Sequence, residues 1–116
     1  MRFEARELKP YAEPVSSENL REGEVYFAVF FLDDDGVIPV LAPRVFIGRD
    51  LDTDDEGVLY FQDFDSYKRG IRFESASGKD EATFETGAEK HMFEYERALD
   101  VLMSCALKRR KARGQG

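Results

Sequence analysis

The chain has 116 residues, with 24 acidic and 17 basic side chains and a formal net charge of −7. Its 42% hydrophobic and 13% aromatic content is too high for a disordered chain, and no apolar run approaches the roughly 18 residues that span a bilayer. One cysteine and one histidine exclude an internal disulfide, a multi-cysteine zinc site and a two-histidine metal site. We therefore expect one soluble domain, without a secretory signal, in a reducing cytoplasm.

The beginning of the chain predicts a polar arm followed by a buried strand. Residues 1–22 are charged and contain proline and serine, and we expect an N-terminal arm with at most one helical turn. Residues 25–32 read VYFAVFFL, a continuous run of β-branched and aromatic residues that is typical of a strand. The Asp35–Gly36 pair that follows favours a tight hairpin turn, because glycine accepts a positive φ.

A second and a third strand follow the predicted turn. Residues 37–47 are rich in β-forming residues but contain Pro39 and Pro43. Proline lacks the N–H that a sheet ladder needs, so this strand lies at an edge of the sheet or is bent at a bulge. An acidic loop then leads to residues 58–62, the third predicted strand.

The next segment predicts one helical turn and two short strands. Residues 65–70 are typical of a helical turn with Asp65 as N-cap and Gly70 as the stop. Residues 71–74 and 82–85 predict the fourth and fifth strands. Five short strands joined by tight turns indicate an antiparallel meander that curls into a small barrel or a twisted sheet.

The last element is a long amphipathic helix from about residue 89 to about residue 110, with a capping-box spacing that allows a start at residue 87. We predict one α+β, mainly β, domain over residues 23–107, between the N-terminal arm and a basic tail at 108–116. Apolar residues repeat along the helix at steps of three and four: Met92, Tyr95, Leu99, Leu102 and Ala106, with Phe93, Ala98 and Cys105 beside them.

Two acidic segments are candidate sites. The loop at residues 50–57 matches the first ligand positions of a calcium loop, but Asp55 replaces the required glycine and Phe61 the required bidentate glutamate, so we interpret it as a solvated turn. Asp63 and Asp65 share one face of an extended segment, as a general acid/base pair or a magnesium site needs, although structural roles in a turn or cap are favoured.

Neither His91 nor Cys105 has the surroundings that catalysis needs. No serine or cysteine lies near His91 in sequence, and we interpret it as structural. Cys105 lies on the apolar side of the helix and far from a helix N-terminus, where reactive thiols are favoured. We therefore assign no catalytic residue, no metal and no cofactor.

The charge and the aromatic residues provide the functional hypotheses. Residues 1–107 carry a net charge of −12, whereas the last nine residues carry +5. One small core has difficulty covering all the aromatic side chains, and excess apolar surface favours dimerisation. The partner-binding residues that we predict are Tyr26, Phe30, Phe46 and Phe93, together with Lys108, Arg109, Arg110 and Lys111.

Three functions follow from these observations, in order of preference. The first is a non-enzymatic protein-interaction or assembly domain that forms a homodimer or docks on a protein partner. The second is contact with nucleic acid through the basic tail, because lysine and arginine neutralise phosphates. The third is a carboxylate-based hydrolase or metal site around Asp63 and Asp65, with Arg44, Arg49 or Tyr67 nearby. Binding of a small ligand inside a barrel is the remaining alternative.

Overall fold

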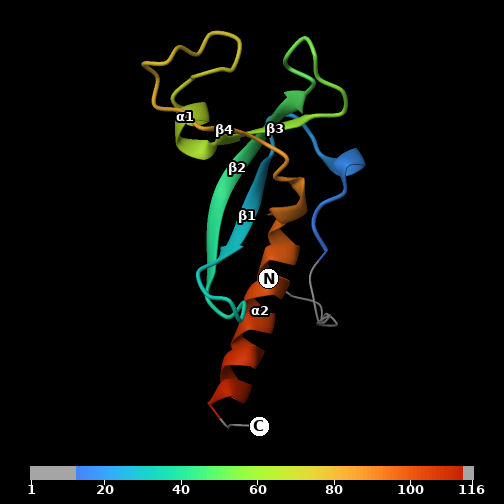
Figure 1. Ribbon diagram of the computed structural model, residues 1–116, viewed down its shortest axis with the longest axis vertical. Coiled ribbons are helices and arrows are strands. Elements are labelled where there is room, and N and C mark those ends of the chain that lie inside the picture. The colour runs from blue at the N-terminus through green and yellow to red at the C-terminus, as the bar shows by residue number, and fades with distance from the viewer. Residues whose placement is uncertain (1–12, 114–116) are drawn as a thin grey trace, which may run out of the picture.

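The computed structural model describes residues 13–113, which form an open, twisted five-stranded antiparallel sheet and a long C-terminal helix (Figure 1). This is the predicted α+β, mainly β, architecture, as a twisted sheet and not as a closed barrel. Residues 1–12 of the predicted N-terminal arm lie outside the described residues. The elements are η1 (Ser17–Asn19), β1 (Val25–Phe31), β2 (Pro39–Arg49), β3 (Leu59–Asp63), α1 (Phe64–Lys68), β4 (Phe84–Thr86), η2 (Glu89–His91), β5 (Met92–Phe93) and α2 (Tyr95–Ala112).

The β1–β2 hairpin is the longest feature of the sheet, and its turn is closed by an aspartate. Seven residues of β1 pair antiparallel with β2. The Asp33 carboxylate accepts backbone N–H groups of Val37 and Ile38 at 2.8–3.1 Å. The Ile38 N–H is the main cause that lowers the pKa of Asp33. Gly36 has a φ of +68°, so the predicted turn is confirmed together with its need for glycine.

The prolines of β2 lie where a sheet tolerates them. Pro39 and Pro43 pair with β1, but β3 joins the other side of β2 only from Arg44 onward. The first half of β2 is therefore an edge strand. The second half is bent where the register shifts between Phe46 and Gly48. Of the two alternatives predicted from the prolines, the edge position is the one that fits them, because the register shift between Phe46 and Gly48 contains no proline.

Of the last two predicted strands, the one at residues 82–85 is present as β4 (Phe84–Thr86), whereas the one at residues 71–74 is absent. Strands β1 to β4 form a meander. Residues 71–74 form no strand. This segment is held against α1 instead, because the Ile71 N–H donates to the Ser66 carbonyl oxygen at 3.1 Å. The fifth strand is β5, which pairs with Phe27 and Ala28 of β1 at the opposite edge of the sheet from β4.

Both faces of β1 are covered by apolar residues. Successive side chains of a strand point to opposite faces, so Tyr26 and Ala28 enter one cluster, and Val29, with the partly buried Phe27, enters the other. This explains why residues 26–29 are apolar without alternation, whereas Val25, Phe30 and Phe31 at the ends of β1 are exposed. The first cluster contains Val15, Leu20, Tyr26, Ala28, Phe46, Leu59, Phe61, Ala88 and Met92. The second contains Val29, Phe93, Ala98, Val101 and Cys105.

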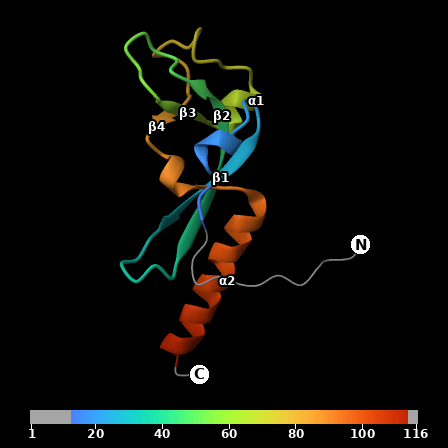
Figure 2. The same ribbon diagram turned by 90° about the vertical axis from the view of Figure 1, so that its right-hand side faces the viewer.

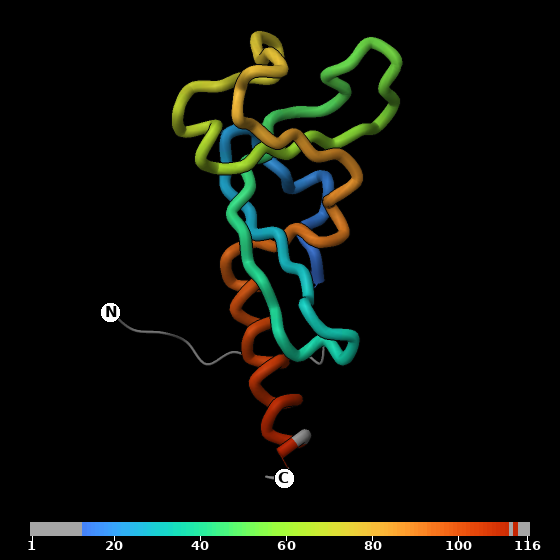
Figure 3. The backbone as a smooth tube through the Cα atoms, turned by 60° about the vertical axis from the view of Figure 1, so that its left-hand side comes forward, coloured from blue at the N-terminus to red at the C-terminus, as the bar shows by residue number. Residues whose placement is uncertain are grey.

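Helix α2 begins later than predicted and continues further. Residues 89–93 form η2 and β5, and Glu94 is the N-cap, so the helix starts at Tyr95. It continues through Ala112, so the predicted basic tail begins inside the helix. Figures 1–3 show the C-terminal half of α2 and the β1–β2 turn at one end of the molecule, and α1 at the other. No helix within residues 13–113 combines the length and hydrophobicity needed to cross a bilayer.

Candidate interaction surface

Much of the apolar stripe predicted for the C-terminal helix faces solvent. The chain's own core covers Ala98, Val101 and Cys105. The neighbouring side of the helix, which we call the outer face of α2, consists of Tyr95, Leu99, Leu102, Met103 and Leu107. These side chains are between 39% (Leu102) and 69% (Tyr95) exposed. Scattered exposed apolar residues are ordinary on a protein surface, but a continuous row of them along one helix marks a contact surface.

A groove runs between the outer face of α2 and the hairpin. This apolar groove has a volume of about 160 Å³. Its lining residues are Phe27, Leu41, Tyr95, Ala98, Leu99 and Leu102. The Tyr95 ring contacts Phe27 edge-to-face, with ring centroids 5.2 Å apart. A second hollow of about 230 Å³ continues past Leu102 to Ala106 and Arg109, beside Pro39 of β2. The two hollows share Leu102 and together follow most of the helix.

An acidic cleft adjoins the start of α2. It has a volume of about 520 Å³ and shares Tyr95 with the apolar groove. Three carboxylates, from Glu18, Glu24 and Glu94, and one guanidinium, from Arg21, contribute to its lining. Sequence reasoning missed this cleft, because its residues come from three separate segments. Tyr26 also lines the cleft, and nothing in the sequence around it indicates that position.

The aromatic residues predicted to bind a partner divide into core and surface. Tyr26, Phe46 and Phe93 are buried, so their side chains stabilise the fold and offer little area to another chain. Phe30 is 39% exposed and contacts the His91 ring at a centroid distance of 5.7 Å. The exposed apolar surface therefore lies mainly on α2 and at the hairpin turn.

The predicted basic residues form the exposed end of a helix. Lys108, Arg109, Arg110 and Lys111 occupy the last two turns of α2, where the helix macrodipole favours cations. The structure thus brings Arg109 next to the hollow beside Pro39 and Ala106. The positive charge of this helix end is continuous with the outer face.

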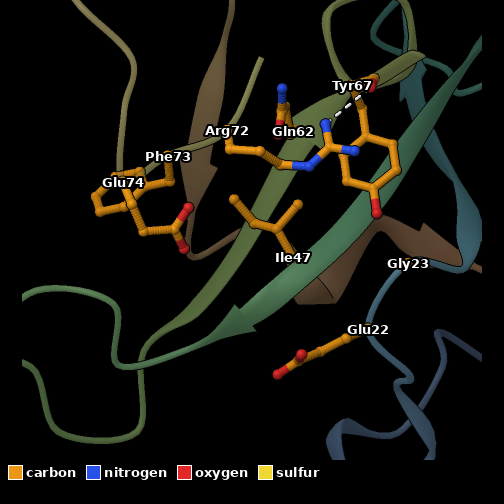
Figure 4. Close-up of a pocket in the computed structure, with 8 residues that line it drawn as sticks. All are labelled: Glu22, Gly23, Ile47, Gln62, Tyr67, Arg72, Phe73 and Glu74. Carbon is orange, nitrogen blue, oxygen red and sulfur yellow. Dashed lines mark hydrogen bonds between the residues drawn. The ribbon is translucent and has the colours of Figure 1, made fainter. Parts of the chain in front are cut away.

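Another pocket lies at the opposite end of the sheet, near α1 (Figure 4). Its volume is about 350 Å³, and Glu22, Gln62 and Glu74 are among its lining residues. Figure 4 shows Arg72 extending to the Tyr67 ring, and its guanidinium carbon lies 3.8 Å from the ring centroid. Arg72 also donates to the Tyr67 carbonyl oxygen at 2.9 Å. These contacts bind the loop after α1 to the helix, which is a structural role.

Asp63 and Asp65 do not share a task. Asp63, and not Asp65, is the N-cap of α1: its carboxylate accepts the Ser66 N–H at 3.0 Å, the Ser66 hydroxyl at 2.6 Å and the Thr83 N–H at 2.8 Å. Burial alone would raise the pKa of Asp63, but these hydrogen bonds outweigh it and the pKa is lowered. Asp65 is exposed and pairs with Arg69 at 3.1 Å.

The basic and aromatic residues expected near the two aspartates have other partners. Arg44 forms an ion pair with Glu85, and Arg49 lies over the Phe46 ring and donates to the Ser17 carbonyl oxygen. Their interactions tie strands and the N-terminal segment together. The arrangement therefore offers no converging acid, base and nucleophile at this point of the fold.

The acidic loop at residues 50–57 is a turn stabilised by its own side chains. The Asp50 carboxylate accepts the Val58 N–H at 2.8 Å, and Asp50 has a φ of +51°. Tyr60 donates its hydroxyl proton to Asp55, and this hydrogen bond is the main cause that raises the pKa of Tyr60 to about 12. Within the described part of the chain, no group of three or more potential ligands is arranged to hold a metal ion.

The single thiol is buried. Cys105 packs in the second apolar cluster, and its Sγ lies 3.6 Å from the Gly36 carbonyl oxygen. Burial raises the pKa of this thiol, which lowers the thiolate fraction at neutral pH. Cys105 is therefore a packing residue, as its position in the sequence indicates.

The comparisons with known proteins add no family. No protein-family description, no curated protein and no solved structure matches the chain.

Proposed function

We propose that this protein is a non-enzymatic interaction or assembly domain that self-associates through the outer face of α2. The observation that carries the proposal is the row of exposed apolar side chains beside the apolar groove. Leu99, Leu102 and Met103 lie on one side of a helix whose other side is already anchored to the sheet. Burying such a row against a second copy removes apolar surface from water at about 25 cal/mol per Å².

The absence of converging chemical groups around Asp63 supports the same choice. The Asp63 carboxylate is fully engaged as a helix cap, and Asp65 forms a surface pair. The hydrolase or metal-site alternative has no geometric support of this kind. The cytoplasmic location expected from the sequence stays a prediction.

Sedimentation equilibrium tests self-association directly. We expect the wild-type chain to sediment at twice its mass of 13.3 kDa. Leu102→Glu places a charge in the centre of the outer face and should produce monomers. Phe64→Glu is the matched control, because Phe64 is 38% exposed against 39% for Leu102 but lies on α1 at the other end of the molecule. A wild-type monomer at every concentration, or a Leu102→Glu dimer, would overturn the proposal.

Contact with nucleic acid is a second candidate, favoured by the four basic side chains in the last turns of α2 and by Arg113 at its C-cap. Such binding would depend strongly on salt, because it releases condensed counterions. Fluorescence anisotropy with a labelled single-stranded oligonucleotide at low salt measures it. Binding that disappears when Arg109 and Arg110 are replaced by glutamine would favour this function, and no binding at low salt would eliminate it.

A further inference from the structure

Helix α2 carries opposite charges at its two ends. Residues 94–103 contain three acidic side chains and one basic side chain, whereas residues 104–113 contain five basic side chains and no acidic one. Two such helices that lie side by side in parallel place the two strongly basic ends together. An antiparallel arrangement places each basic end beside the acidic end of the other helix, and opposite charges attract.

The outer face has a spacing that fits an antiparallel pair. Tyr95, Leu102 and Arg109 are seven residues apart, and residues at this spacing lie along nearly the same side of a helix. Tyr95 and Arg109 each lie about 10.5 Å from Leu102 along the helix axis. A two-fold axis at Leu102 therefore places Arg109 of one chain opposite Tyr95 of the other.

The acidic cleft lies where this arrangement needs negative charge. It shares Tyr95 with the apolar groove and is lined by Glu18, Glu24 and Glu94. The last turns of a second α2, from Arg109 to Arg113, would pass Tyr95 and reach this cleft. The basic residues would then have carboxylates nearby, and a guanidinium over the exposed Tyr95 ring would add a cation–π contact.

We infer that the occupant of the outer face is a second copy of this chain, with the two α2 helices antiparallel about an axis near Leu102. The basic end of each α2 lies over the acidic cleft of the other copy, beside Tyr95. This inference rests on the proposed self-association and adds its orientation and its charged contacts. Such an interface is isologous and closes at two chains, because each copy offers the same surface.

Cysteine cross-linking determines the orientation. The background is Cys105→Ser, which leaves one introduced thiol per chain. In the antiparallel dimer, Met103→Cys lies next to the axis and links to itself. Leu107→Cys lies five residues from the axis, so its two copies are about 15 Å apart along the helices and form no disulfide, which needs Cα atoms within about 7 Å. Mixing Glu96→Cys with Arg110→Cys should give a heterodimer link.

The outcomes separate the two proposals. If the wild-type chain is a monomer, both the self-association and its orientation are overturned. If the chain is a dimer that Leu102→Glu disrupts, but Leu107→Cys links to itself as efficiently as Met103→Cys, the helices are parallel and only the orientation is overturned. Oxidised products are compared on non-reducing gels at a fixed chain concentration.

A charge-reversal pair tests the contact with the acidic cleft. We expect Arg109→Glu to raise the dimer dissociation constant by about tenfold or more, and Lys68→Glu, an exposed position on α1 at the other end of the molecule, by about twofold or less. Adding Glu24→Lys to Arg109→Glu should restore most of the affinity. Equal effects of Arg109→Glu and Lys68→Glu, or no rescue by Glu24→Lys, would refute the placement of the basic end over the cleft.

Discussion

The Asp63 carboxylate is predicted to be one of the strongest polar stabilising groups of the fold. It caps α1 through the Ser66 N–H and also accepts the Thr83 N–H from a residue 20 positions away. Loss of an N-cap costs about 1 kcal/mol, and a hydrogen bond to a charged group is worth about 1.5–3 kcal/mol. We therefore expect Asp63→Ala to lower the free energy of unfolding by about 3 kcal/mol.

The assay is urea and thermal unfolding followed by circular dichroism. For a chain of this length, 1 kcal/mol corresponds to about 4 °C, so the Tm of Asp63→Ala should fall by about 12 °C. Asp65→Ala is the control, because Asp65 lies two residues away, is 80% exposed and makes a surface pair. We expect it to cost less than about 0.5 kcal/mol. An Asp63→Ala variant as stable as Asp65→Ala would refute the reasoning.

The same carboxylate predicts a pH dependence. The pKa of Asp63 in the folded chain lies below its ordinary value of 3.8. Its contribution to stability is therefore present above about pH 4 and is lost as the pH falls through 3.8 toward the folded-state pKa. The difference in stability between the wild type and Asp63→Asn should shrink over this range. A constant difference down to low pH would contradict the lowered pKa.

Three further predictions concern the core, a tyrosine and the thiol. Phe61 is fully buried and its ring contacts Phe46. In urea unfolding, Phe61→Ala should lower the free energy of unfolding by about 3–5 kcal/mol, and Phe64→Ala, at an exposed position, by far less. Similar losses of stability in the two variants would contradict the assigned core. The pKa of Tyr60 is about 12, and ultraviolet titration of Asp55→Asn should show it nearer 10; an unchanged titration would exclude the hydrogen bond as its cause. Cys105 should react slowly with a disulfide reagent until guanidinium unfolds the chain, and rapid native reaction would show that it is not buried.

The sequence by itself determined most of the local structure. A continuous apolar run predicted β1, the prolines predicted an edge or bend in β2, and the period of three and four residues predicted α2. Each of these signals acts between near neighbours in the chain, through backbone dihedral angles or through side chains on one face. For that reason these elements can be predicted without knowledge of the tertiary contacts.

The tertiary structure decided which surfaces are covered. The apolar stripe of α2 is wide enough to pack in more than one way, and contact with Phe27, Val29 and Leu41 covers the side with Ala98 and Val101. Leu99 and Met103 are left exposed as a consequence. Likewise, the acidic cleft exists because β1, η1 and the start of α2 meet. Such contacts join residues far apart in sequence, and no local pattern specifies them.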